Sequence, residues 1–196
     1  MVAHGHHTAS AFLQSPIQSA ICNLQSALRA SSMTPLMKAV QKNDTVRVRE
    51  LIASGADVDA LDPNGDAPLV MAAYLGHSAI VTLLLDAGAD VRAVDPSMKA
   101  TALHAAAYAG RTEAARLLIA GGVDINRQGP RNGYTALHDA IWENHADTAR
   151  VIIEAGADLT LKAHSGETPL DFARARGRTE IVAMIEGAGR SGGSDI

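Results

Sequence analysis

Apolar residues occur along this chain in two alternating kinds of run, separated by polar stretches. In the first kind, for example "TALHAAAYAG" at 101–110, Leu and Ala stand three residues apart, the spacing of one narrow helix face. In the second kind, for example "VTLLLDA" at 81–87, the apolar residues are nearly continuous. The stretches that precede the first kind of run hold Asp, Pro, Asn and Gly, which favour turns. The pattern predicts pairs of short helices joined by turns.

The pattern is an internal repeat with a period of 33 or 34 residues, and it occurs five times. The copies start with "TPLMKAVQKN" at 34, "APLVMAAYLG" at 67, "TALHAAAYAG" at 101, "TALHDAIWEN" at 135 and "TPLDFARARG" at 168. Each first run closes with a residue that tolerates the positive φ of a helix C-cap: Asn43, Gly76, Gly110, Asn144 and Gly177. A second glycine follows each start by 21 residues, at Gly55, Gly88, Gly122, Gly156 and Gly189. Each copy predicts a helix, a turn and a second helix, followed in the first four copies by a projecting hairpin.

The repeat resembles the ankyrin repeat. The resemblance rests on the T-[PA]-L start, the Ala three residues after the Leu, the Gly/Asn turn, the Leu-rich second helix and the G-A-D ending, over about residues 32–189. It implies an all-α, ankyrin-type helix-turn-helix repeat solenoid with projecting β-hairpin fingers, with units starting near 32, 65, 99, 133 and 166. In the family, the fingers and the first helices line a concave face. The fifth copy lacks a finger, which fits a terminal repeat, and Val123 stands where the family has Ala.

The segments outside the repeats predict a flexible His-containing leader over 1–14, an N-terminal capping helix over 15–31 and a flexible tail over 190–196. Ser15 and Pro16 suit the start of that helix, and apolar residues follow at helical spacing. An organelle transit peptide is the alternative interpretation, because no acidic residue precedes Asp44 and serines are plentiful. Transit peptides are rich in Arg, whereas Arg29 stands alone here, which favours the capping helix.

Composition narrows the class of protein. Of the 196 residues, 47% are hydrophobic but only 3% are aromatic, so Ala, Leu, Val and Ile must build the core. The formal net charge of −4 argues against a nucleic-acid or anionic-membrane surface. Cys22 is the single cysteine, which excludes an internal disulfide, and no apolar run approaches the roughly 20 residues that span a bilayer. We expect a soluble, cytoplasmic monomer without cofactors.

Two short motifs match the sequence patterns of known functional sites, but each lacks a feature that its site requires. Ser191 lies in "GRSGG", which matches the G-x-S-x-G nucleophile elbow, but that elbow needs a strand before it and a helix after it. A hydrolase that uses Ser191 is therefore only a formal alternative. Asp62, Asn64 and Asp66 resemble the start of a calcium loop, but Ala67 occupies the position that requires Gly. We predict no catalytic residue and no calcium site.

The histidines fall into two groups. Repeat register predicts that those beside the helix ends hydrogen-bond to backbone: His77, His104, His138 and His145. His4, His6 and His7 stand in the leader, and imidazole groups bind Zn, Cu and Ni. A metal-binding or metal-delivery protein that uses this N-terminal cluster is the alternative function.

Residues that vary between the copies indicate a binding surface. The eighth position of the first run carries Tyr74, Tyr108 and Trp142 in the three central copies, which include the only Trp of the chain. The family resemblance places this position and the next one on the concave face, and it places Tyr134 on a finger that contacts ligands. The other predicted partner-binding residues are the ninth-position Leu75, Glu143 and Arg176, and the finger charges Asp66, Lys99 and Arg131.

Trp, Tyr and Arg are the residues that most often dominate binding energy at protein interfaces. Charges of both signs around an aromatic row suit a protein partner better than a nucleic-acid strand, which would favour one sign. We therefore predict a non-enzymatic protein–protein interaction module that binds an unidentified partner protein on its concave face, without nucleic acid or membrane. The alternative is a row that only packs between neighbouring helices.

Overall fold

The computed structural model describes residues 33–95 and 99–191. The repeats lie within one compact unit, Thr34–Ile196. The predicted leader over 1–14 and the predicted capping helix over 15–31 lie outside the described residues, as does the predicted tail beyond residue 191.

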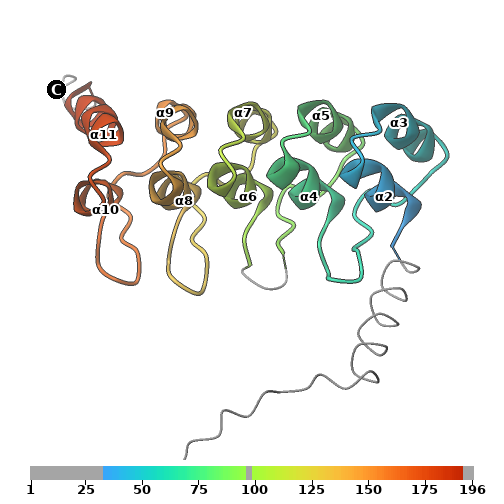
Figure 1. The fold of residues 1–196 in the computed structure, drawn as a ribbon, viewed down its shortest axis with the longest axis horizontal. Helices are drawn as coiled ribbons and strands as arrows, with labels where there is room; N and C mark the ends of the chain where they lie inside the picture. Colours follow the sequence, from blue (N-terminus) through green and yellow to red (C-terminus); the bar gives the residue numbers. More distant parts are fainter. Residues whose placement is uncertain (1–32, 96–98, 192–196) are drawn as a thin grey trace, which may run out of the picture. The chain divides into compact units, whose positions relative to one another are not determined.

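The described residues form ten helices in five pairs, one pair for each predicted copy. The pairs are α2 (Pro35–Gln41) with α3 (Thr45–Ala53), α4 (Pro68–Leu75) with α5 (Ser78–Asp86), α6 (Ala102–Tyr108) with α7 (Thr112–Ala120), α8 (Ala136–Glu143) with α9 (Ala146–Glu154), and α10 (Pro169–Ala175) with α11 (Thr179–Ser191). Figure 1 shows the first helices side by side in one row, the second helices in another, and loops projecting beyond the first row. The predicted all-α repeat solenoid is confirmed.

The ends of the first helices lie at the residues that the sequence indicates or one residue away from them. Thr34 Oγ1 accepts a hydrogen bond from the Met37 amide at 3.1 Å, which caps the start of α2. The five residues predicted as C-caps all have φ between 55° and 78°: Asn43, Gly76, Gly110, Asn144 and Gly177. Gly76 and Asn144 are the C-caps of α4 and α8, whereas the C-caps of α2, α6 and α10 are one residue earlier than predicted, at Lys42, Ala109 and Arg176. Gly189 differs from the other glycine landmarks because it lies inside α11, which also takes in the first two residues of the predicted tail.

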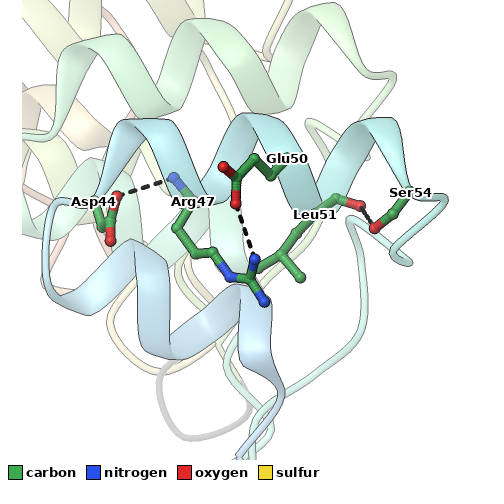
Figure 2. Close-up of polar contacts among 5 residues, drawn as sticks. All are labelled: Asp44, Arg47, Glu50, Leu51 and Ser54. Carbon is green, nitrogen blue, oxygen red and sulfur yellow. Dashed lines mark hydrogen bonds and ion pairs between the residues drawn. The ribbon is translucent and has the colours of Figure 1, made fainter.

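Helix α3 illustrates how polar side chains define a second helix (Figure 2). The Asp44 carboxylate accepts a hydrogen bond from the Arg47 amide at 2.9 Å, and Ser54 Oγ donates to the Leu51 carbonyl at 2.8 Å. The Arg47 guanidinium pairs with Glu50 at 2.9 Å. The N-cap contributes about 1 kcal/mol to helix stability, whereas the exposed ion pair adds roughly 0.5 kcal/mol or less.

Small apolar side chains fill the core, as the composition predicts. The Leu and Ala residues three apart in the first helices are each 4% exposed or less: Leu36, Ala39, Leu69, Ala72, Leu103, Ala106, Leu137 and Ala140. Alanine allows neighbouring helices to approach closely, and α4 packs against α6 while α6 packs against α8. The same alanine spacing thus both buries each first helix and stacks it on the next.

The fingers are held by side chains and turns rather than by regular strands. The buried Asp62 carboxylate accepts hydrogen bonds from the amides of Asn64 at 2.8 Å and Asp66 at 2.9 Å, which closes the turn before α4. One isolated antiparallel bridge, between Val94 and Thr101, is the strand-like pairing that the structure assigns within its described part. Regular β-hairpins remain a prediction from the family resemblance.

Candidate functional site

Three aromatic side chains of the predicted row are exposed on neighbouring helices. Tyr74, Tyr108 and Trp142 stand in the last turns of α4, α6 and α8, and they are 47%, 48% and 46% exposed. These helices pack side by side, so the three rings belong to adjacent units (Figure 1). Among the described residues, the other large hydrophobic side chains exposed to this extent are Val46 and Leu61. The row is therefore a concentrated aromatic surface on an aromatic-poor chain.

The backbone of the row is held by the next unit along the chain. In each case a side chain at the start of the second helix of the next unit contacts the carbonyl oxygen of the row residue. The contacts are Arg111 Nε to Tyr74 at 3.1 Å, His145 Nε2 to Tyr108 at 3.1 Å and Arg178 Nη2 to Trp142 at 2.8 Å. These bonds fix the main chain under the rings from one unit to the next.

The predicted backbone role of the histidines is confirmed at three positions, one of them His138, whose Nδ1 accepts a hydrogen bond from the Thr135 amide at 3.3 Å. His145 contacts the Tyr108 carbonyl, and His104 Nε2 lies 3.2 Å from the Tyr134 carbonyl in the next unit. His138 Nδ1 lies 2.9 Å from its own N-cap, Thr135 Oγ1. Burial lowers the pKa of His138 to about 4 and also lowers the pKa of His104, so both rings are neutral at pH 7.

Trp142 lies on an aromatic cluster that we call the Trp142 platform, made of Tyr134, His138, Trp142, Phe172 and Arg176. The fully buried Phe172 ring is centred 4.9 Å from Tyr134 and 6.1 Å from Trp142. The Arg176 guanidinium lies 4.6 Å from the centroid of Trp142 and 3.4 Å from that of Phe172. Such cation–π contacts contribute about 0.5–1 kcal/mol at exposed sites and restrain the indole. Tyr134 packs partly buried in this platform.

A hollow of about 570 Å³ lies beside Tyr74 and Tyr108. It brings together residues from α4, α6 and α8 and from the loops before α4 and α6. Its lining is Asp66, Val70, Met71, Tyr74, Leu75, Asp95, Ala100, His104, Ala105, Tyr108 and Asp139. Loops and first helices therefore border one surface, and we call the hollow and the aromatic row together the inner surface.

Carboxylates interrupt the otherwise mainly apolar wall of the hollow. Burial, followed by the charge of Glu143 one helical turn away, raises the pKa of Asp139 to about 7. Burial, followed by the charges of neighbouring aspartates, raises the pKa of Asp66. The lining includes no Lys or Arg among the described residues, and His104 is neutral at pH 7. The hollow therefore favours a cationic group over an anionic one.

The other predicted site residues divide between these features. Leu75 and Asp66 line the hollow, Glu143 is exposed at the end of α8, Arg176 stacks on Trp142, and Lys99 and Arg131 are exposed on fingers. Lys99 has φ 56° at the position where three other fingers place a glycine, so its backbone is held in a conformation that L residues seldom adopt. The predicted residues thus form a hollow, a platform and a flanking set of charges.

Comparison with known families agrees with this architecture. A family model described as "Ankyrin repeats (3 copies)" matches residues 1–95 and 93–163. The chain belongs to the ankyrin-repeat family. Ankyrin repeats are generally protein–protein interaction modules and are typically not enzymes. A search of curated proteins finds no match.

The sequence analysis of this ankyrin-repeat chain missed one variable position. The fifth residue of the first run carries Met71, Ala105, Asp139 and Phe172 in the second to fifth units. This position precedes the aromatic row by three residues and therefore shares its helix face. It lines the hollow in three units and forms the base of the Trp142 platform in the last. The signal was present in the sequence, because this position varies between the copies as the eighth position does.

The described part of the ankyrin-repeat chain contains no group of three or more His, Cys, Asp or Glu side chains that could hold a metal ion. The Asp62 carboxylate, which resembles a calcium ligand in sequence, accepts amide hydrogen bonds within its own finger. His4, His6 and His7 lie outside the described residues.

Ser191 is the last residue of helix α11, so no strand precedes it. No helix among the described residues has the length and apolar character needed to cross a membrane.

Asp139 is expected to make the stability of the ankyrin repeats depend on pH. Because folding raises its pKa from 3.8 to about 7, the folded protein holds this proton more tightly than the unfolded chain does. The free energy of unfolding should therefore fall as pH rises from about 4 to about 7. In urea titrations at pH 8, Asp139→Asn should be more stable than the wild type by about 1–2 kcal/mol, a value reduced for the partial solvent exposure of the carboxyl.

The difference between Asp139→Asn and the wild type should shrink towards zero near pH 4, because both side chains are then neutral. Glu154→Gln serves as the control, since it removes an exposed carboxylate of α9 that does not contribute to the raised pKa of Asp139. A variant that is less stable than the wild type at pH 8 would contradict this account of the Asp139 environment.

Proposed function

We propose that this chain binds a partner protein on its inner surface and acts there as a rigid scaffold. Tyr74, Tyr108 and Trp142 are the apolar anchors, and Leu75 extends the apolar contact. The observation that carries the proposal is the concentration of half-exposed aromatic rings on three adjacent helices, with their backbone carbonyls bound by the next unit. A surface that is already ordered loses little entropy on binding.

Flanking polar residues would set specificity in this proposal. Arg176 is stacked on Trp142, and Glu143, Asp66, Lys99 and Arg131 add charges of both signs around the anchors. Tyr134 acts through the Trp142 platform, which it helps to pack. A mixed charge pattern favours a protein partner over nucleic acid and steers association. We further propose that the chain works as a cytoplasmic monomer.

The test is affinity capture from source-cell lysate with wild type and with a Tyr74→Ala, Tyr108→Ala, Trp142→Ala triple variant. Each captured partner is then purified and its affinity is measured by calorimetry. Loss of three interface anchors should weaken binding by about 30-fold or more, because single hot-spot residues contribute about 2 kcal/mol. Val46→Ala is the matched control, since Val46 is 68% exposed and belongs to α3 in the second-helix row.

Circular dichroism melting would establish that all three proteins are folded. A folded triple variant that binds every captured partner as tightly as the wild type would contradict the proposal and leave the row a packing feature. Equal losses in the triple variant and in Val46→Ala would also contradict it, because the binding site would then not be confined to the inner surface.

A further inference from the structure

The hollow on the inner surface has the size and lining to take one long side chain. Its volume of about 570 Å³ falls in the range of roughly 300–1,000 Å³ that is usual for ligand pockets. Val70, Met71 and Leu75 form an apolar wall from α4, and the half-exposed rings of Tyr74 and Tyr108 stand at its border. This lining suits methylene groups and leaves two aromatic faces beside them.

Two carboxylates of the hollow, Asp66 and Asp139, form no ion pair or side-chain hydrogen bond with another described residue. No described residue donates a hydrogen bond to the Asp139 carboxylate, and the Asp66 carboxylate likewise has no hydrogen-bond donor among the described residues. Asp66 is involved through its backbone only, with its amide donating to Asp62 and its carbonyl accepting from the Asp62 amide. Asp95 differs, because its carboxylate caps the adjacent finger by accepting from the Ala100 amide at 2.8 Å. Two carboxylates are therefore available to a ligand.

We propose that this hollow binds a lysine or arginine side chain of the partner protein, with the methylene stem against Met71, Tyr74 and Tyr108 and the cationic head at the acidic part of the lining, which Asp66 and Asp139 supply. Long basic side chains bury their stems along apolar surface and keep their charge at a polar site. Tyrosine faces attract the same cations. The raised pKa of Asp139 agrees, because a cation beside that carboxylate would relieve the unfavourable burial of its charge. The inference rests on the proposed function, since it assigns one contact of the same partner.

The opposite end of the aromatic row disfavours a basic group. There Trp142 already carries the Arg176 guanidinium on its ring, so a second cation would meet a like charge. The basic residue of the partner is therefore expected over the hollow, which α4, α6 and Asp139 in the first turn of α8 border, rather than over the Trp142 platform. The partner segment is therefore expected to bind in one orientation, with its basic residue over the hollow.

The first experiment selects peptides from a phage-displayed random dodecapeptide library on immobilised full-length protein. Wild type should enrich peptides with Lys or Arg at one aligned position, whereas an Asp66→Asn, Asp139→Asn variant should not. Glu154→Gln is the matched control, because it removes an exposed carboxylate of α9 that does not line the hollow. It should keep the enrichment.

The second experiment replaces the enriched basic residue of one selected peptide with norleucine. For wild type the dissociation constant should rise about tenfold or more, since close charge pairs at interfaces couple strongly. For the Asp66→Asn, Asp139→Asn variant the two peptides should bind with affinities that agree within about threefold. Light scattering of the protein alone shows whether a second copy fills the hollow.

The outcomes separate this inference from the proposed function. Selected peptides that compete with each other and bind the triple aromatic variant poorly, but carry no basic preference, overturn the inference and leave the proposed function intact. A basic preference that survives in the Asp66→Asn, Asp139→Asn variant overturns it as well. Failure to select any peptide that depends on the inner surface overturns both. A dimer of wild type that the double variant abolishes assigns the hollow to a second copy and overturns the partner assignment.

Discussion

Replacing Phe172 by alanine is expected to lower the free energy of unfolding by about 3–5 kcal/mol. Phe172 is fully buried and forms the base of the Trp142 platform, where its ring meets Tyr134, Trp142 and the Arg176 guanidinium. Truncation would leave a cavity beside α8, whose backbone is held by Arg178 through hydrogen bonds to the Ile141 and Trp142 carbonyls. The large cost therefore combines lost apolar burial with lost ring contacts.

Urea titration followed by circular dichroism measures this loss, and hydrogen exchange locates it. Units of a repeat array contact only their neighbours. Protection of the backbone amides against hydrogen exchange should therefore fall most in α10 and α11 and least in α4 and α5. Tyr108→Ala is the matched control, because it removes an aromatic ring that is 48% exposed; it should change stability by less than about 1 kcal/mol. Similar losses for the two variants would show that the inner-surface rings are structural.

Gly133→Ala is expected to destabilise the protein more than Gly166→Ala, although the two glycines occupy the same position in successive fingers. Both have positive φ, 70° and 86°, so each substitution carries a backbone cost of roughly 1–2 kcal/mol. A Cβ on Gly133 would lie 2.6 Å from His164 Cδ2 and 2.8 Å from the His164 backbone nitrogen, whereas a Cβ on Gly166 meets nothing within 4 Å. The clash should add about 1–3 kcal/mol at Gly133 alone.

The pair of variants isolates the approach of one finger to the next. Denaturant titration of both proteins gives the difference directly, since their backbone costs nearly cancel. His164 donates its amide to the Asn132 carbonyl at 2.8 Å, so the backbone that must move is already bound. A result in which Gly166→Ala is as destabilised as Gly133→Ala would mean that the fingers relax around the new methyl group.

Most of the architecture could be read from local patterns. Caps such as Thr34 and C-cap residues such as Asn144 act within a few residues of themselves, so their roles follow from residue type and spacing. Leu103 and Ala106 occupy one helix face by periodicity alone, and the structure buries both. The 33- or 34-residue period then extends each local conclusion to every unit. In the fifth copy this reasoning failed, because Gly189 lies inside α11 instead of ending it.

The chemistry of the inner surface depends on residues that the chain holds far apart. Asp66, Tyr108 and Asp139 meet in one hollow because three successive units stack in register. Burial of a carboxyl is set by the side chains of neighbouring units, so the altered pKa of Asp139 had no signature in its own segment. The contact of Arg176 with Trp142 likewise joins two units. Sequence alone determined the helices, their caps and the exposed aromatic row, because these arise from short-range spacing. Only the tertiary structure decided which carboxylates and rings share a surface, because that depends on packing between units.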